Sequence, residues 1–366
     1  MSNLRIESLR DLQRAHGLQV IALVPGANLF YCTGLQKSLS ERPCVMFLPV
    51  EDIPHLLLPE FEVADAEQQL TFEHRIYTYS DAQGYSQAFR HLCRDLGLNG
   101  KQAGIEFTHM RVFEQREIAL AAPECQFVDA EALLAHLRIR KDPTELAALQ
   151  EAARLNERVL RQVIASIELG QSEKEIAAAY QMAAFQAQSD GLAFDPIVVS
   201  GPNGALPHAY PGDRHIRAGE FITLDCGVKY RHYCSDITRT IGVGEISDRL
   251  KAIYDVVYEA NEAGRSSVRP GVTAESVDRA TRQVITKAGY GDYFTHRTGH
   301  GLGLEVHEPP YIVEGNATVL EPGMVFTIEP GIYIPGLGGV RIEDNVFVTP
   351  TGCESLTTLP RELILL

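Results

Sequence analysis

Side chains that could do chemistry are concentrated in three stretches of the second half of the chain. The run 295–308, THRTGHGLGLEVHE, holds three of the twelve histidines and alternate glycines. Two acidic segments flank it, upstream at 222–240 with Asp225 and Asp236, and downstream at 326–344 with Glu329 and Glu343 as the candidates. We expect the acids and one histidine to hold two metal ions, and the other histidines to act on a substrate. The candidates are His296, His300, His307, Asp225, Asp236, Glu329 and Glu343.

Two of these acids interrupt apolar runs at matching positions, Asp225 in FITLDCG and Glu329 in FTIEPG. Carboxylates that converge in a core repel one another unless cations neutralise them. Oxygen ligands with a single imidazole favour Mn²⁺, with Co²⁺ or Zn²⁺ as alternatives. Two such ions, about 3.5–4 Å apart, generate a hydroxide near neutral pH and polarise a carbonyl. The histidine spacing is not the HExxH of single-zinc peptidases.

An internal duplication explains how four acids could meet. The segments 170–176 and 271–277 match, and each places a Ser or Thr N-cap two residues after a glycine. The segments 219–227 and 323–331 match as well, so the two acids of the first half correspond to those of the second. Each half is predicted to form helices and then an antiparallel hairpin with one acid per strand. A pseudo-two-fold axis between the halves would bring the four acids together.

The first third of the chain is predicted to form a small α/β domain with a mixed sheet, because short apolar runs bounded by turn residues alternate with helical stretches. No metal cluster or phosphate loop motif occurs there. The expected elements are a helix over 2–16, strands over 20–24, 45–50, 55–59 and 75–79, and helices around 85–97 and 110–121.

The domain boundary is expected near residues 137–143. Asp142 is the predicted N-cap of a long helix, with Pro143 at its first position and Glu145 at its third, which is a capping box. The expected division is a first domain over 1–133, a linker over 134–144 and a second domain over 145–366.

Composition narrows the class of protein. The chain has 366 residues, 45% of them hydrophobic, and a net charge of −15, which argues against nucleic acid or an anionic membrane as partner. Seven cysteines without a CxxC motif indicate a reducing compartment. No apolar run approaches the ~20 residues that span a bilayer. A cytoplasmic location is therefore expected.

Five ordered motifs resemble the pita-bread metallopeptidases, above all their Xaa-Pro dipeptidase (prolidase) and aminopeptidase P branch. The resemblance is strong over 140–366 and looser over 1–133. It implies an α+β fold, in which a pita-bread (creatinase/aminopeptidase) domain with a pseudo-two-fold repeat follows a small creatinase-type α/β domain. The motifs are SGPNGALPHAYP (200–211), LDCGVKYRHYCSDITRT (224–240), HRTGHGLGLEVHEPP (296–310), TIEPGIY (327–333) and VRIEDN (340–345).

The resemblance implies a dinuclear metal site made of Asp225, Asp236, His300, Glu329 and Glu343. Asp236 and Glu343 would bridge both ions, and His300 would bind one of them. Glu329 would also act as the acid/base that handles the proton of the metal-bound water.

The resemblance also implies roles for residues around the metals. His208 and His307 would hydrogen-bond the substrate and stabilise a tetrahedral intermediate. His296 would lie on the substrate side or support a ligand, and Tyr333 matches a supporting tyrosine. Arg341 precedes the last carboxylate by two residues, so on a strand it would face the same way and orient that carboxylate or a substrate group.

The implied activity is hydrolysis of the bond between an N-terminal residue and proline in di- or oligopeptides, by a cytoplasmic homodimer. An Xaa-Pro bond has no amide N–H, so peptidases that need this donor handle it poorly. Two alternatives remain open: a non-peptidase C–N amidohydrolase on the same scaffold, and a binding module with a vestigial site. The choice between dipeptidase and aminopeptidase is also open, and the length of the chain leans toward the compact prolidases.

Overall fold

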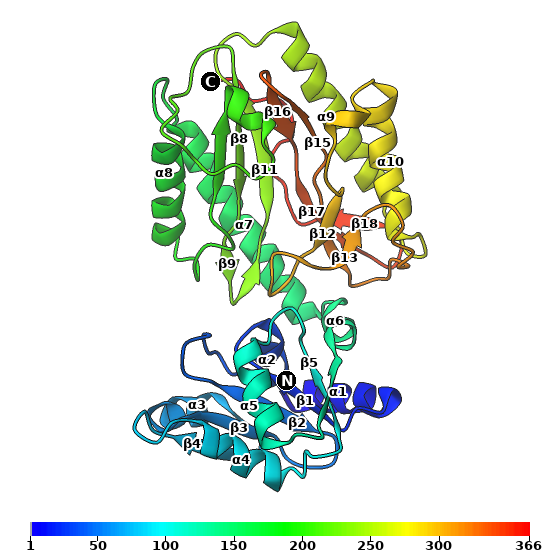
Figure 1. Cartoon of the computed structure of the whole chain (residues 1–366). Helices are drawn as coiled ribbons and strands as arrows, with labels where there is room; N and C mark the ends of the chain where they lie inside the picture. Colours follow the sequence, from blue (N-terminus) through cyan, green and yellow to red (C-terminus); the bar gives the residue numbers. More distant parts are fainter. Residues whose placement is uncertain (1) are drawn as a thin grey trace. The chain divides into compact units, whose positions relative to one another are not determined.

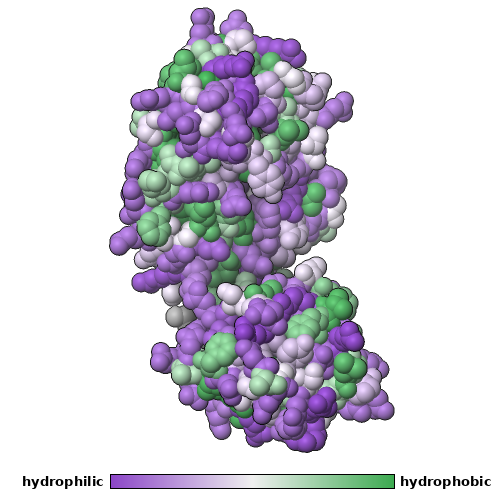
Figure 2. All heavy atoms as spheres, turned by 60° about the vertical axis from the view of Figure 1, so that its left-hand side comes forward, coloured by the Kyte–Doolittle hydropathy of each residue, from purple (hydrophilic) through white to green (hydrophobic). Residues whose placement is uncertain are grey.

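The computed structural model describes residues 2–366, with side chains from Leu4 onward. The chain divides into two compact units, one up to Arg138 and one from Ile139 (Figure 1). In the face shown in Figure 2, hydrophilic residues predominate and hydrophobic ones form scattered patches. Within the described residues no helix is long and apolar enough to cross a membrane.

The first unit is an α/β unit built on a mixed sheet. Its strands are β1 (Val20–Leu23), β2 (Val45–Pro49), β3 (His55–Pro59), β4 (Arg75–Tyr79), β5 (Gln102–Ile105) and β6 (Gln126–Asp129). Its helices are α1 (Ser2–His16), α2 (Ala27–Thr33), η1 (Glu60–Glu62), α3 (Val63–Gln69), α4 (Ser86–Asp95), α5 (Val112–Ala121) and α6 (Glu131–Arg138).

The strand order of this sheet is β4-β3-β2-β1-β5-β6. β1 pairs antiparallel with β2 and parallel with β5, so the predicted mixed sheet is confirmed. On one face, Val20 and Phe47 pack against Phe89, Leu92 and Ile118 of the helices. The first helix and four strands were predicted within one or two residues, because their apolar periodicity is strong. The short β5 and β6 and the helices α2, α3 and α6 were not predicted.

The second unit begins with the long helix α7 (Pro143–Ala165), and its predicted capping box is present. Asp142 Oδ1 accepts hydrogen bonds from the Thr144 and Glu145 amides at 2.7 and 2.9 Å, and Glu145 Oε2 accepts one from the Asp142 amide at 2.9 Å. The segment 134–144, expected to be a linker, contains the end of α6 and the first residues of α7.

The remaining elements follow in two similar sets. The helices are α8 (Glu173–Gln186), η2 (Gly201–Ala205), α9 (Asp248–Ser267), α10 (Ala274–Lys287) and η3 (Gly291–Tyr293). The strands are β7 (Ile197–Ser200), β8 (Phe221–Cys226), β9 (Lys229–Tyr230), β10 (Tyr233–Cys234), β11 (Ile237–Gly242), β12 (Gly299–Gly301), β13 (Glu308–Ile312), β14 (Val325–Ile328), β15 (Gly331–Ile334), β16 (Gly338–Arg341), β17 (Asp344–Val348) and β18 (Cys353–Ser355).

The predicted duplication is visible in these elements. In the first half α7 and α8 are followed by a sheet of order β11-β8-β7, and in the second half α9 and α10 are followed by β13-β12-β14-β17-β18. The antiparallel pair β8–β11 corresponds to β14–β17. Figure 1 shows the strands between the two helix pairs. The N-caps Ser172 and Thr273 begin matching helices of 14 residues, each after a glycine with a positive φ.

Each half buries apolar residues between its helices and strands. In the first half Ile222 and Leu224 of β8 belong to one cluster with Tyr180 of α8. In the second half Ile328 of β14 packs in a cluster with Val277 of α10. β8 and β14 are thus buried along their length, so Asp225 and Glu329 are held by well-packed strands.

Candidate metal centre

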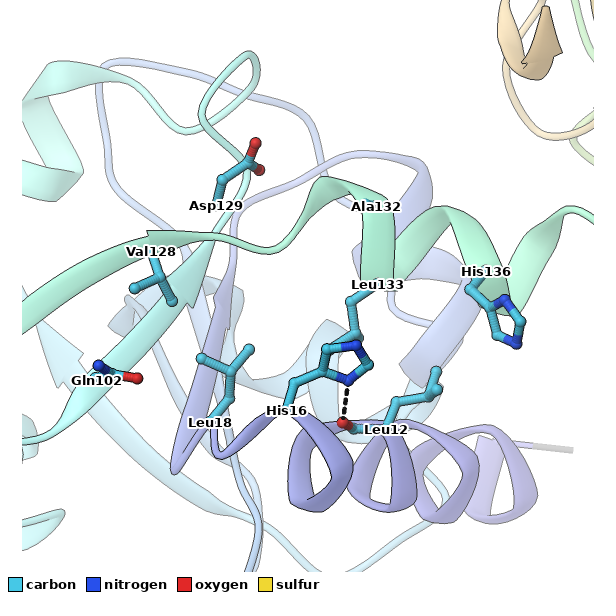
Figure 3. A pocket seen from close by; sticks show the side chains of 9 residues that line it. All are labelled: Leu12, His16, Leu18, Gln102, Val128, Asp129, Ala132, Leu133 and His136. Atoms are coloured by element: carbon cyan, nitrogen blue, oxygen red, sulfur yellow. Dashed lines mark hydrogen bonds between the residues drawn. The ribbon is translucent and has the colours of Figure 1, made fainter. Parts of the chain in front are cut away.

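Two hollows in the molecule differ in chemistry. One in the first unit has an apolar part made of leucine, valine and alanine, and Figure 3 shows its polar side chains, His16, Gln102, Asp129 and His136, spread around it without converging. The one in the second unit has a volume of about 750 Å³. Its lining includes Asp225, Asp236, His300, Glu329, Glu343, His208, His296, His307 and Arg341.

The four acids come from corresponding places in the two halves. Asp225 lies within β8, whereas Asp236 directly precedes β11, Glu329 directly follows β14 and Glu343 directly precedes β17. The expectation of one acid per strand is therefore refined, because three of the acids sit at strand ends. Thr238 joins the halves: it lies opposite Asp225, and its hydroxyl donates to Glu343 Oε2 at 2.7 Å.

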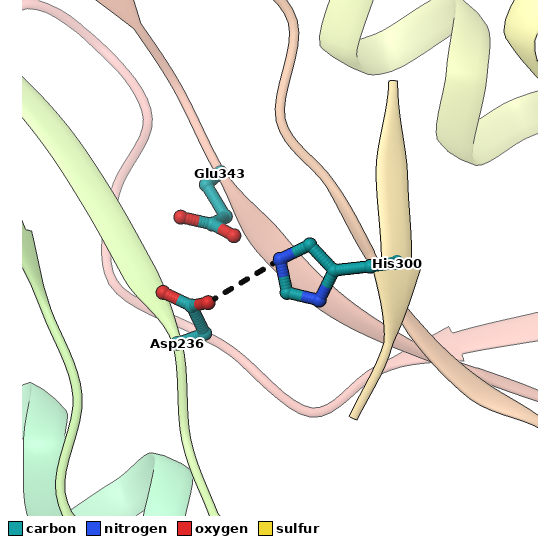
Figure 4. A group of neighbouring side chains, drawn as sticks. All are labelled: Asp236, His300 and Glu343. Carbon is teal, nitrogen blue, oxygen red and sulfur yellow. Dashed lines mark ion pairs between the residues drawn. The ribbon is translucent and has the colours of Figure 1, made fainter. Parts of the chain in front are cut away.

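Three of these carboxylates have a buried oxygen without a hydrogen-bond partner among the described residues: Asp225 Oδ1, Asp236 Oδ1 and Glu343 Oε1. Buried polar atoms are nearly always paired, so three orphans lining one cavity need an explanation. Asp236, His300 and Glu343 each offer a ligand atom, all within 4.8 Å of one another, and Figure 4 shows their side chains pointing together. This donor set of carboxylate oxygens and one imidazole suits divalent cations.

His300 is held in place by its backbone. Its amide donates to Thr327 Oγ1 at 3.1 Å, and its Nδ1 lies 3.2 Å from the carbonyl of Gly301. Because a carbonyl only accepts, Nδ1 carries the proton in the neutral ring, and the lone pair of Nε2 then faces the acids. Nε2 lies 3.2 Å from Glu329 Oε1 and 3.6 Å from Asp236 Oδ2, where it could bind a metal.

The protonation of the acids reflects their crowding. Burial raises the pKa of Asp236 well above its usual value, and the charges of Glu343, Asp225 and Glu329 raise it further. Burial and the charges of Glu329 and Asp225 likewise raise the pKa of Glu343. Burial alone would raise the pKa of Glu329, but hydrogen bonding and charge from His300 lower it to about 2. The cluster therefore holds more carboxylates than positive partners for them, and cations would supply the missing positive charge.

Arg341 differs in its partner from our expectation. Its guanidinium donates to Asp225 Oδ2 at 2.6 Å and not to Glu343, and its Nε lies 3.2 Å from the hydroxyl of Thr238. Of the two expected roles of Arg341, the contact with the last carboxylate is replaced by one with the first acid of the opposite half, and the role toward a substrate group stays a prediction. Alternation along one strand cannot reveal a partner 116 residues away.

Behind the cavity, His296 and Tyr333 form a chain with this arginine. His296 Nδ1 lies 2.7 Å from the carbonyl of Arg297, so Nδ1 carries the proton and Nε2 accepts from the Tyr333 hydroxyl at 2.8 Å. That hydroxyl accepts from Arg341 at 2.9 Å. Burial lowers the pKa of His296, which agrees with a neutral ring.

The two remaining histidines lie at the exposed rim of the cavity. His208 follows the short helix η2, and His307 precedes β13. The His307 ring packs edge-on against His300 with 4.2 Å between centroids. Partial burial, His300 and Arg297 lower the pKa of His307 to about 4. Both are placed to contact a molecule in the cavity.

Sequence reasoning missed several residues that support this site. The hydroxyl of Thr238 donates to Glu343, and that of Thr327 accepts from the His300 amide. Arg297 lines the cavity, with its guanidinium 4.5 Å from the centre of the Tyr311 ring. Lys141 and Glu308 form a buried ion pair at 2.6 Å, next to His307. The motif around Glu308 offered a signal, since an acid directly follows a predicted site histidine.

Comparison with known proteins agrees with this geometry. Residues 147–350 match the model of the family described as "Metallopeptidase family M24", and residues 5–140 match that of the "Creatinase/Prolidase N-terminal domain". The chain belongs to metallopeptidase family M24. Membership in this family implies divalent metals, and the chain is an enzyme of the metallopeptidase class.

Relatives cover nearly the whole chain. A solved prolidase from Thermococcus sibiricus is 37% identical, covers 100% of this chain and 99% of its own, and has a TM-score of 0.95. A solved Xaa-Pro dipeptidase from Bacillus anthracis is 35% identical over 100% of both chains, with a TM-score of 0.91. The putative dipeptidase YkvY of Bacillus subtilis is 37% identical over 93% of each chain. The predicted M24 fold with its creatinase-type first domain is confirmed.

Proposed function

We propose that this M24 enzyme is a dinuclear-metal Xaa-Pro dipeptidase, which hydrolyses the bond between an N-terminal residue and a C-terminal proline. The observation that carries the proposal is the set of buried carboxylate oxygens without partners around one cavity, at Asp225, Asp236 and Glu343. The similarity to a prolidase and an Xaa-Pro dipeptidase over the full chain supports the substrate class.

The residues that would hold the two metal ions are Asp225, Asp236, His300, Glu329 and Glu343. The orphaned oxygens and the unprotonated Nε2 of His300 fit this role. Two divalent cations held there supply Lewis acidity, which activates water and polarises the scissile carbonyl. We propose Mn²⁺ as the ion, because oxygen ligands dominate the set.

The other residues are assigned to protons and orientation. Glu329 has its carboxylate next to His300 and would take the proton from the attacking water and pass it to the leaving proline nitrogen. His307 has a pKa of about 4, so it is neutral near pH 7 and donates an N–H to the charge that develops on the scissile carbonyl oxygen. His208, across the rim, would hold the substrate.

The chain of His296, Tyr333 and Arg341 would orient Asp225. Arg341 binds Asp225 Oδ2 directly, and the orphaned Oδ1 would be available to hold a metal ion. A tertiary Xaa-Pro amide offers no N–H, so the site needs no acceptor for one, and activation of the carbonyl becomes the main requirement. Two alternatives, an amidohydrolase acting on other C–N bonds and a binding module, are not favoured by the relatives.

We further propose that the enzyme acts as a homodimer in the cytoplasm. All seven cysteines are free, which fits a reducing compartment.

A direct experiment compares Mn²⁺-loaded enzyme on Ala-Pro and on Ala-Pro-Ala. The proposal predicts release of proline from Ala-Pro and little cleavage of the tripeptide. Efficient cleavage of the tripeptide would replace the dipeptidase with an aminopeptidase. Turnover of small amides without cleavage of either peptide would favour the amidohydrolase.

A further inference from the structure

The loop that carries His208 is anchored at both ends by one buried carboxylate, that of Glu173. This residue is the first of α8 and is fully buried. Its Oε1 accepts hydrogen bonds from the Ser200 amide at 2.7 Å and the Ser200 hydroxyl at 2.9 Å. Its Oε2 accepts from the Gly212 amide at 3.0 Å, and Asn203 Nδ2 lies 3.1 Å from both oxygens.

These contacts close the loop 200–212 into a ring. The amides at its two ends, those of Ser200 and Gly212, meet on a single side chain. The backbone of α8 adds two bonds near the same end, because the Glu173 amide donates to Arg214 O at 3.0 Å and the Lys174 amide to Gly212 O at 3.2 Å. Glu173 thus fixes the loop without being one of the residues that line the cavity.

Two contacts hold the middle of the loop against the strand that leads to the acids. Gly204 packs on Gly339 so closely that a Cβ there would lie 3.2 Å from the Gly339 amide nitrogen. Arg341 donates to the carbonyl of Pro207, directly before His208, at 3.2 Å. With the ends on Glu173 and the middle on β16, the position of His208 at the rim is set by the loop's anchors.

Comparison of the two halves shows that a helix at this position does not need a carboxylate at its first residue to begin. The N-cap residues Ser172 and Thr273 match, so the residue that corresponds to Glu173 is Ala274, which begins α10. A matching helix thus begins without a carboxylate at this position. Within the described residues Glu173 forms no ion pair with Lys or Arg, and its oxygens are directed to the loop.

We propose that Glu173 is a positioning residue for catalysis, which holds His208 in place through the loop 200–212. The proposal rests on the proposed peptidase function, in which His208 contacts the substrate. Glu173 accepts hydrogen bonds from two backbone amides, and a glutamine has only one acceptor oxygen. In Glu173→Gln the side-chain NH2 group must therefore face the backbone amide of either Ser200 or Gly212, and the hydrogen bond from that amide is lost.

The test is a double-mutant cycle on Ala-Pro hydrolysis with Mn²⁺-loaded enzyme. We expect Glu173→Gln to lower kcat/KM roughly 10–100-fold, mostly through a higher KM, with the metal content unchanged. In a His208→Ala background the same change should alter kcat/KM less than about 2-fold, since the two act through one group. Lys174→Gln, which removes only an exposed pair with Asp213, is the matched control and should behave as wild type. Equal losses in both backgrounds would overturn the proposal.

Hydrogen–deuterium exchange of the metal-loaded protein gives a second readout that needs no turnover. Glu173→Gln should speed exchange in peptides covering 198–213 and leave those covering 222–240 and 326–344 at the wild-type rate. Unchanged exchange in 198–213, or faster exchange throughout the second unit, would overturn the positioning role. Failure of wild-type enzyme to cleave Ala-Pro would refute the proposed function, and the exchange result would still decide whether Glu173 anchors the loop.

Discussion

At the scale of residues, the site is a group of buried carboxylates whose mutual repulsion bound cations would relieve. Asp236 and Glu343 are both almost fully buried and each has an orphaned oxygen, and the charge of Glu343 adds to burial in raising the pKa of Asp236. Such an arrangement is unfavourable for folding on its own and favourable once positive charge is bound. In the metal-free protein, the carboxylates that metal binding would require therefore lower the stability of the fold.

Asp236→Asn separates the two effects. The variant should bind fewer than two metal ions per chain and lose more than about 100-fold in Ala-Pro hydrolysis, since even supporting residues at metal sites cost 10–100-fold. Without metal it should unfold at a higher temperature than metal-free wild type, because one buried negative charge is gone. Metal analysis and thermal unfolding in chelator measure both. A metal-free variant less stable than wild type would contradict the repulsion argument.

Tyr333→Phe tests the chain behind the cavity. The change removes the donor to His296 and the acceptor for Arg341 while the ring stays in place. We expect kcat to fall roughly 10–100-fold with both metals retained, because Asp225 is then less firmly oriented. Tyr258→Phe, on α9 and away from the cavity, is the control. Wild-type kcat in Tyr333→Phe would mean that the chain has no catalytic role.

At the scale of elements, close backbone approach decides where His300 sits. β12 pairs with β14 and β13, and its glycines leave no room for a side chain. A Cβ at Gly299 would overlap the carbonyl of Thr327, and one at Gly301 would overlap that of Pro309. Gly299 and Gly301 are thus explained by the close packing of β12 against its neighbouring strands on either side of His300.

Gly299→Ala should accordingly destabilise the second unit by at least about 3 kcal/mol, since the obstacle is backbone that cannot rotate away. Gly352→Ala is the control, because a Cβ there meets nothing within 4 Å. Denaturant unfolding of the metal-loaded proteins measures both. Equal stability of the two variants would show that β12 moves freely from β14.

Sequence patterns predicted the features that follow from local or repeated spacing, and they missed side-chain contacts between residues far apart in the chain. The capping box at Asp142, the duplication and the strand 55–59 follow from local spacing, and the structure contains them. The pairing of Arg341 with Asp225 and of Glu173 with the loop 200–212 joins residues far apart in sequence. The Arg341–Asp225 contact forms only when the two halves fold together, and the Glu173 contacts form only when α8 packs against the loop 200–212, so no spacing rule could supply them. The expected roles of the site residues stay predictions.

At the scale of the whole molecule, metal binding and folding should be linked. The predicted ligands come from β8, β12 and the ends of β11, β14 and β17, so bound ions tie both halves of the second unit together. Native-state binding at 100 times the dissociation constant contributes about 2.7 kcal/mol. For a unit of this size, each kcal/mol corresponds to roughly 2–4 °C in Tm.

Chelation should therefore lower the Tm of the wild-type protein by roughly 5–11 °C, and Mn²⁺ should restore it. Differential scanning calorimetry with and without chelator measures the shift. The Asp236→Asn variant, with an incomplete site, should show a smaller shift. An identical Tm with and without metal would contradict the link between the site and the stability of the second unit.

The most direct test of the central claim is release of proline from Ala-Pro by metal-depleted enzyme before and after Mn²⁺ is added back, with the Asp225→Asn variant in parallel. The account predicts no release from depleted enzyme, recovery with Mn²⁺, and no recovery in the variant. Proline release that survives complete metal removal, or a fully metal-loaded wild-type enzyme that leaves Ala-Pro intact, would contradict it.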